Sequence, residues 1–293
     1  MIKPDDRETL EHVAGDLTLS RADYEDIIAR AEAAARHWDF TAPARVLDRV
    51  VEVRDPGRPR GAARRRIVAA LALRLPERIP ALRLPGSILE LYPDAVGKMA
   101  RFLREDEPEY DLDHYAKDAR LALGASVPGG AEIVDLYSRI GPRLALRQIG
   151  HRDGVTSLAR YLTAGSFRPM LQIHLDARDT ADFNEAGREA VYRRVADLLA
   201  RDRTRAGMIA TSWFYDPALP AISPRLAYLQ RPLEHGAYRL FICATRLDAE
   251  RAAAKSPTRR ALIEEGAYKP ASYSLIWPRV ALLAWVRSRG RRS

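Results

Sequence analysis

The stretch "MLQIHLDARDTADFNEAG", Met170–Gly187, decides how the second half of the chain folds. Its first six residues are apolar enough for a buried strand. The residues that follow, "DFNEAGREAVYRRVADLLARDRTRAG", have a helical stripe at Val191, Val195, Leu198 and Leu199, and we expect Gly207 to end that helix. The next segment, "MIATSWFYD", is rich in β-branched and aromatic residues. Together these segments predict a strand, a long helix and a second strand.

The same alternation continues on both sides of this unit. Before it, "AEIVDLYSRI" is strand-like and "GVTSLARYLTAG" is typical of a short helix. After it, "YRLFICAT" and "ASYSLIWP" are strand-like, and "SPRLAYL" and "SPTRRALIEEG" each begin a helix with Ser-Pro. Alternation of this kind predicts an α/β domain with a mixed central sheet.

The first part of the chain has a helical pattern instead. In "SRADYEDIIARAEAAARHW", Ser20 is an N-cap and Asp23 stands three residues later, as in a capping box. Prolines from Pro76 to Pro93 predict that the following region is broken into short helices. We therefore expect a helical N-terminal domain over residues 1–120 and an α/β domain over residues 121–293, with the boundary between about 105 and 130.

Composition limits the class of protein. The chain has 293 residues, 47% of them hydrophobic and 30% charged, which fits a globular protein of about two domains. We find no apolar run of roughly 18 residues and no apolar signal core, so we expect no membrane segment and a cytoplasmic location. Cys243 is the single cysteine, which excludes an internal disulfide.

The net charge of +9 comes almost entirely from arginine. Much of the excess lies in "RDPGRPRGAARRR", Arg54–Arg66, and in the tail Arg287–Ser293. Such runs attract phosphates or an acidic partner protein. Because no aromatic residues are interleaved with the charges, we expect no specific binding of nucleic acid. A non-catalytic protein that binds an acidic partner through these arginines is one of three functions that the sequence leaves open.

His174 and Asp176 suggest a second possibility, because residues two apart on a strand face the same side. With His235 as a distant third ligand, they match the two-histidine, one-carboxylate set that binds Fe(II). Arg239 or Arg246 could then bind an acidic cosubstrate, as in an oxygenase that uses 2-oxoglutarate. The alternative is that both residues form hydrogen bonds near the end of a strand and bind no metal.

A third possibility comes from the order of the predicted elements over roughly residues 131–280. This order resembles the later half of the GNAT acyltransferases, in which two neighbouring strands separate and the acyl donor enters between them. The resemblance implies an acyl-CoA or acyl-carrier thioester as donor. Where the family has Arg/Gln-x-x-Gly-x-Gly/Ala to bind a diphosphate, this chain has Asn184, Gly187 and Ala190, with Asp179 and Glu185 nearby. That departure suggests a donor on an acidic carrier protein, which Arg54–Arg66 could bind.

The resemblance also implies roles for single residues. Tyr228 occupies a place comparable to the tyrosine that protonates the leaving thiolate in GNAT enzymes. His174 or Asp176 could accept the proton of the amine, and Asp216, just past a strand, could line the same site. On this interpretation, which we favour, the protein is an acyl- or group-transfer enzyme acting on a small molecule or a carrier-bound acyl group.

A separate anion site is predicted at a helix start. Lys255, Arg259 and Arg260 surround the N-terminus of the helix expected in "SPTRRALIEEG". Cations and free backbone N–H groups both favour a phosphate or a carboxylate at such a place. The alternative is that they are ordinary surface charges beside a helix cap.

Overall fold

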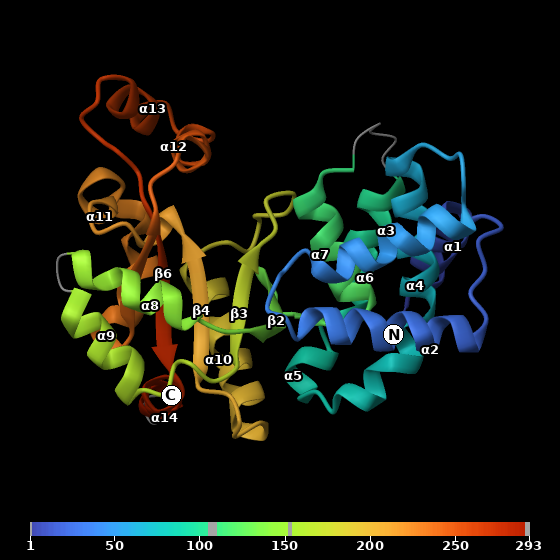
Figure 1. Ribbon diagram of the computed structural model, residues 1–293, viewed down its shortest axis with the longest axis horizontal. Coiled ribbons are helices and arrows are strands. Elements are labelled where there is room, and N and C mark those ends of the chain that lie inside the picture. Colours follow the sequence, from blue (N-terminus) through green and yellow to red (C-terminus); the bar gives the residue numbers. More distant parts are fainter. Residues whose placement is uncertain (1, 105–109, 152–153, 291–293) are drawn as a thin grey trace. The chain divides into compact units, whose positions relative to one another are not determined.

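The computed structural model describes residues 2–104, 110–151 and 154–290, and Figure 1 shows its elements. The chain forms two compact units. The first comprises Met1–Ser138 and Leu175–Asp182, and the second comprises Arg139–His174 and Phe183–Ser293. The predicted class is confirmed, because a helical N-terminal region precedes a mixed-sheet α/β region. The first unit, however, extends beyond residue 120 to Ser138. It also includes Leu175–Asp182, which lies along the chain between the two parts of the second unit.

Helices dominate the first unit. The N-cap predicted at Ser20 is present, since its hydroxyl accepts a hydrogen bond from the backbone N–H of Asp23 at 3.2 Å. The apolar face predicted for that helix is buried at Tyr24, Ile27 and Ile28. The helices are α1 (Pro4–Ala14), α2 (Arg21–Ala35), α3 (Ala42–Arg54), α4 (Arg60–Leu82), α5 (Gly86–Leu89), α6 (Tyr92–Arg104) and α7 (Leu112–Ala122).

The prediction that prolines divide this region into short helices is wrong for α4. This helix continues through Pro76 and Pro80 over 23 residues. A proline inside a helix costs about 3 kcal/mol. Ile67, Leu71 and Leu75 are fully buried in α4, and each buried side chain of this size contributes roughly 1.5–3 kcal/mol. Tertiary packing therefore outweighs the local preference of the two prolines.

A β-hairpin completes the first unit. Strands β1 (Ser126–Pro128) and β2 (Glu132–Ser138) pair antiparallel, with Val127 opposite Val134. Arg120 of α7 is fully buried and forms an ion pair with Asp135 of β2. It also donates to the carbonyl oxygen of Phe40 at 3.2 Å. One buried guanidinium thus joins α7, the hairpin and the segment before α3.

The second unit contains four strands in the order β3-β4-β6-β5. The first two are parallel and are joined by α10, whereas β6 pairs antiparallel with both of its neighbours. The helix stripe predicted at Val191, Val195, Leu198 and Leu199 is buried. The strands are β3 (Met170–Leu175), β4 (Gly207–Ser212), β5 (Tyr238–Cys243) and β6 (Ser272–Pro278), and α10 spans Glu185–Arg201.

Helices cover both faces of this sheet. On one face, α8 (Pro142–Arg147), the 3-10 turn η1 (Gln148–Gly150) and α9 (Gly154–Thr163) pack on a core that includes Met170, Ile209 and Leu240. On the other, the rings of Tyr192 of α10 and Trp285 of α14 (Arg279–Gly290) both contact the ring of Trp277, the first edge-to-face and the second tilted. The remaining elements are η2 (Trp213–Tyr215), α11 (Leu219–Ile222), η3 (Pro224–His235), α12 (Arg246–Ala253) and α13 (Pro257–Glu264).

Two local predictions differ from the structure. Gly207 does not end α10, which stops at Arg201; it begins β4, where a Cβ atom would lie 2.2 Å from the carbonyl oxygen of Trp277. The segment after Ser223 is a 3-10 helix rather than an α-helix, and the serine makes no cap bond. Its hydroxyl instead accepts a hydrogen bond from Arg259 at 3.1 Å.

Among the described residues, no helix is long and apolar enough to span a bilayer.

Candidate functional site

The parallel strands β3 and β4 stop pairing before they end. Their last paired residues are Ile173 and Ala210, although the strands continue to Leu175 and Ser212. Ser212 remains opposite Tyr273 on the other side of β4. Figure 1 shows the two arrows pointing the same way and separating toward their tips. Backbone groups on this side of β4 are therefore outside the β3–β4 ladder, and such an edge can bind an extended chain that contains amides.

His174 lies at the point of separation. It directly follows the last paired residue of β3, and its side chain is half-buried. The Nε2 atom is buried. An imidazole is the side chain that most readily accepts and releases a proton near neutral pH. The structure thus places one predicted site residue at the point where β3 and β4 stop pairing.

Asp176, the second predicted residue, is held in an ion-pair network of the first unit. Its carboxylate accepts hydrogen bonds from Arg178, with an Nη2–Oδ2 distance of 2.7 Å, and Arg178 also forms two bonds of 2.8 Å to Asp118. Burial alone would raise the pKa of Asp176, but the hydrogen bonds and charge of Arg178 outweigh burial and lower that pKa. Asp176 is therefore a poor proton acceptor.

The side chain of Tyr228 contacts the segment just before the start of α10. It is half-buried on η3, and its hydroxyl donates to the carbonyl oxygen of Phe183 at 3.4 Å. With Glu185 and Arg188 it lines a cavity of about 20 Å³. A space of this size can hold a single water molecule. Tyr228 thus stands beside the helix start that the family resemblance singled out.

Asp216 is tied into its own loop. The carboxylate accepts hydrogen bonds from the backbone N–H groups of Ala218 and Ala271, both at 2.9 Å. A third comes from the hydroxyl of Tyr268 at 3.4 Å. The residue is buried, with 6% of its surface exposed. These contacts indicate that Asp216 fixes the loop after β4.

The predicted anion site is not assembled, because its central cation faces inward. Arg259 is buried, donates to the carbonyl oxygen of Ala252 at 2.6 Å and stacks on Trp213. Burial lowers the pKa of Arg259. Lys255 and Arg260 remain exposed. The helix start therefore presents two surface cations rather than three converging ones.

The proposed iron ligands do not form a cluster. His235 is exposed at the end of η3, where its ring lies 6.5 Å from that of Trp285, measured between centroids. Within residues 2–104, 110–151 and 154–290, no group of three or more histidine, cysteine, aspartate or glutamate side chains is placed to hold a metal ion. At one of the three expected ligands there is a physical reason for this: the carboxylate of Asp176 is already paired with Arg178.

The arginine run Arg54–Arg66 is largely bound by carboxylates of the first unit. Arg64 makes two hydrogen bonds of 2.8 Å to Asp48, and Arg60 reaches the same carboxylate at 2.9 Å. The other pairs are Arg54 with Asp23, Arg58 with Asp55, and Arg66 with Asp16 and Asp55. Most guanidinium groups of this run therefore already have a carboxylate partner within the chain, and binding of an acidic partner by the run stays a prediction.

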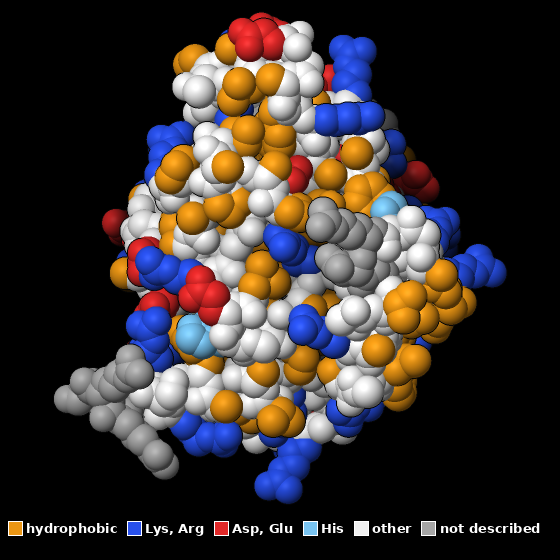
Figure 2. Space-filling model, turned by 90° about the vertical axis from the view of Figure 1, so that its left-hand side faces the viewer, with side chains coloured by type: hydrophobic (Ala, Val, Ile, Leu, Met, Phe, Trp, Pro, Cys, Tyr) orange, Lys and Arg blue, Asp and Glu red, His pale blue; other side chains and the backbone are white. Residues whose placement is uncertain are grey.

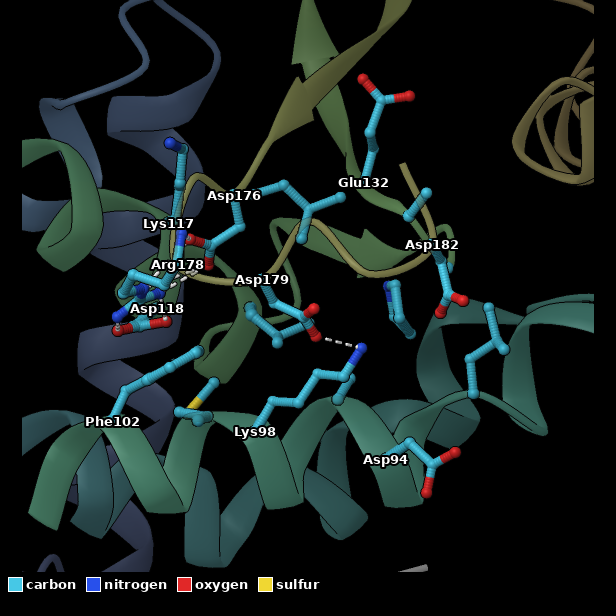
Figure 3. A pocket seen from close by; sticks show the side chains of 18 residues that line it. Asp94, Lys98, Phe102, Lys117, Asp118, Glu132, Asp176, Arg178, Asp179 and Asp182 are labelled. Atoms are coloured by element: carbon cyan, nitrogen blue, oxygen red, sulfur yellow. Dashed lines mark hydrogen bonds and ion pairs between the residues drawn. The ribbon is translucent and has the colours of Figure 1, made fainter. Parts of the chain in front are cut away.

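The sequence did not predict a cavity of about 130 Å³ in the first unit. Charged side chains line this cavity (Figure 3), together with apolar ones that include Met99, Phe102 and Leu121. Arg178 stacks on Phe102, with its guanidinium carbon 4.3 Å from the ring centroid. The lining carries six carboxylates and three cations: Asp94, Asp118, Glu132, Asp176, Asp179 and Asp182, with Lys98, Lys117 and Arg178.

Part of this charge is neutralised within the cavity. Lys98 pairs with Asp179 at 2.6 Å, and Arg178 pairs with two further carboxylates. The side chains of Glu132 and Asp182 also line the cavity (Figure 3). The excess of carboxylates over cations favours a positively charged occupant. The short spacing of "DAR" could have signalled the local pair, whereas the contact with Asp118 spans 60 residues.

Comparisons with known proteins give no relative. No family model matches the chain, and neither a curated protein nor a solved structure matches it significantly.

Proposed function

We propose that the second unit is an acyl-transfer domain of GNAT-like type. The observation that carries this proposal is the early end of pairing between the parallel strands β3 and β4. In GNAT enzymes the arm of the acyl donor lies between two such strands. Amide groups of a pantetheine arm would bind the edge of β4 that faces β3 beyond Ala210, as an added strand does.

His174, at this edge, and Tyr228, beside the start of α10, would carry the proton transfers. The nitrogen of an amine attacks the thioester carbon, the carbon–sulfur bond breaks, and the thiolate leaves. His174 would take the proton from the amine, and the hydroxyl of Tyr228 would give a proton to the thiolate. We leave Asp176 out of this scheme because Arg178 holds its carboxylate.

The charges near α10 favour a donor attached to a carrier over free coenzyme A. Arg231 pairs with Glu185, and Arg188 is buried against Tyr192. The first turn of α10 therefore has few cations available for a diphosphate. A carrier-bound thioester places a single phosphodiester near the protein, and this group needs fewer cations than a diphosphate does.

Thiol release tests this proposal. The protein is mixed with acetyl-pantetheine, acetyl-CoA or an acetylated acyl carrier protein, together with a panel of primary amines. We expect the fastest release of thiol from the carrier or from pantetheine. We expect His174→Ala and Tyr228→Phe each to lower kcat by about 10²- to 10⁴-fold. Glu234→Gln, at an exposed position of η3, is the matched control.

The proposal fails if no thioester loses its acyl group faster than it does without protein. It also fails if both substitutions leave kcat unchanged while circular dichroism shows intact folding.

Binding of a small organic cation by the first unit is a second candidate function, favoured by the acidic lining of its cavity. A primary amine with a short hydrocarbon part could place its ammonium near Glu132 and Asp182 and its carbons on Met99 and Phe102. Calorimetric titration with linear amines tests this binding. Asp182→Asn should weaken it, and Asp26→Asn, on an exposed part of α2, should not.

A further inference from the structure

Among the described residues, eight large hydrophobic side chains are more than half exposed, and five of them lie in one short part of the second unit. We call this part the α8–α9 surface, and it covers residues 139–151 and 154–168. Val155 is the most exposed of its apolar side chains, with 70% of its surface free. The set consists of Leu146, Ile149, Val155, Leu162 and Phe167, each more than half exposed.

Arginine is the only charged residue type among the described residues of the α8–α9 surface; Arg152 and Asp153 of the sequence lie outside them. Its described residues include no aspartate and no glutamate. No ion pair in the described part of the chain involves Arg143, Arg147 or Arg160. The five arginines are Arg139, Arg143, Arg147, Arg160 and Arg168, and all are exposed. Figure 2 shows this side of the second unit, with orange and blue side chains beside each other.

The inner face of these helices is already packed. Ala145 and Tyr161 are buried in the core, and the hydroxyl of Tyr161 donates to the carbonyl oxygen of Ile140 at 3.0 Å. Gln148 is buried and exchanges hydrogen bonds with the backbone of Phe241 at 2.8 and 2.9 Å. The outward apolar residues are therefore not part of an incomplete core. They form the outer side of an amphipathic layer that is anchored to the sheet.

The charge of the α8–α9 surface limits what can cover it. In a two-fold dimer the same patch faces itself, so its arginines would face the arginines of the second copy. A second copy is therefore disfavoured. An anionic partner is favoured, because each guanidinium can donate two parallel hydrogen bonds to a phosphate or a carboxylate.

The shape of the surface favours a lipid bilayer over a protein. Val155, Leu162 and Phe167 project from helices and a turn, and the two described cavities are lined by other residues. Protein interfaces concentrate their binding energy in side chains that fill matching pockets. A bilayer accepts projecting apolar side chains in any arrangement, and its phosphates lie at the level of the flanking arginines.

We propose that the α8–α9 surface binds an anionic membrane surface, with Val155, Leu162 and Phe167 at the level of the headgroups and Arg143, Arg147 and Arg160 on the lipid phosphates. This is a peripheral contact and involves no membrane-spanning element. It is independent of the acyl-transfer proposal.

Sedimentation with vesicles tests the inference. The full chain is mixed with vesicles of phosphatidylcholine containing phosphatidylglycerol and with vesicles of phosphatidylcholine alone. We expect binding to the anionic vesicles only, weakened by salt. Replacing Arg147 or Arg160 by Ala should lower the partition coefficient roughly five-fold for each arginine. Val155→Ser should lower it about ten-fold.

Matched controls come from the rest of the chain. Val53→Ser changes an apolar residue that is 80% exposed on α3, and Arg246→Ala removes an exposed arginine on α12. Neither should alter partition. The inference is overturned if the chain binds neither kind of vesicle, or if Val155→Ser, Arg147→Ala and Arg160→Ala sediment like the unchanged chain. Binding to polyglutamate without binding to anionic vesicles would overturn it in favour of an acidic protein.

Discussion

Two regions of the molecule are rich in arginine but differ in the environment of these side chains. In the first unit, the run Arg54–Arg66 is bound by aspartates that are distant along the chain, such as Asp48 and Asp16. In the second unit, the arginines of the α8–α9 surface face solvent among exposed apolar side chains. A high local charge in the sequence therefore does not predict a charged surface. The placement of distant carboxylates decides it.

The largest effect on the free energy of unfolding is expected when a buried arginine of the first run is removed. Arg64→Ala leaves Asp48 buried without its main partner, and we expect a loss of about 3–5 kcal/mol in the free energy of unfolding. Urea denaturation measures this loss. Arg147→Ala on the α8–α9 surface is the control and should change stability by less than about 0.5 kcal/mol. Equal effects of the two substitutions would contradict the difference in environment.

Two neighbouring arginines on α13 also differ in burial, and we expect a smaller difference between the effects of their removal on stability. Arg259→Ala removes hydrogen bonds to Ala252 and Ser223, and we expect it to cost about 1.5–3 kcal/mol of unfolding free energy. Arg260→Ala changes an exposed side chain and should have almost no effect. Thermal unfolding of both variants checks this. If Arg260→Ala were the more destabilising change, the assigned burial would be wrong.

Acid should weaken the first unit through Asp48. Burial alone would raise the pKa of Asp48, but Arg64 and Arg60 outweigh burial and lower it below 3.8. A carboxyl group with a lowered pKa stabilises the fold above its unfolded value, and this contribution is lost as pH falls through the folded value. We therefore expect the free energy of unfolding to fall below about pH 4. This acid-dependent loss should be smaller in Asp48→Asn than in the unchanged chain.

The smallest effect is expected for the half-exposed pair of Arg54 and Asp23. Such pairs contribute about 0.2–1 kcal/mol. Arg54→Ala should therefore lower the urea midpoint only slightly, and salt should reduce the difference further. A loss as large as that of Arg64→Ala would show that exposure does not separate these arginines.

Periodicity in the sequence predicted most of the fold. The stripe of α10, the cap of α2 and the strands of the second unit all depend on neighbours within a few residues, and these predictions were confirmed. The course of α4 through Pro76 and Pro80 could not be predicted in this way, because its stability comes from burial against distant helices.

The candidate site was predictable only in part. His174 was found because it stands two residues before Asp176 on a predicted strand, and the structure places it where β3 and β4 separate. The ion pair that occupies Asp176 could be suspected from Arg178 two residues later, but the contribution of Asp118 comes from α7. Likewise, Arg259 belongs to a helix start in the sequence and to a buried contact with Trp213 in the fold.

Because Leu175–Asp182 belongs to the first unit, neither unit is one continuous piece of polypeptide. A fragment cut after Ser138 would keep Asp118 and lose the guanidinium that neutralises it. A separate fragment of the first unit would therefore need the eight residues Leu175–Asp182 joined to residues 1–138. During synthesis on the ribosome, the helical part cannot complete its contacts until more than forty further residues have been added.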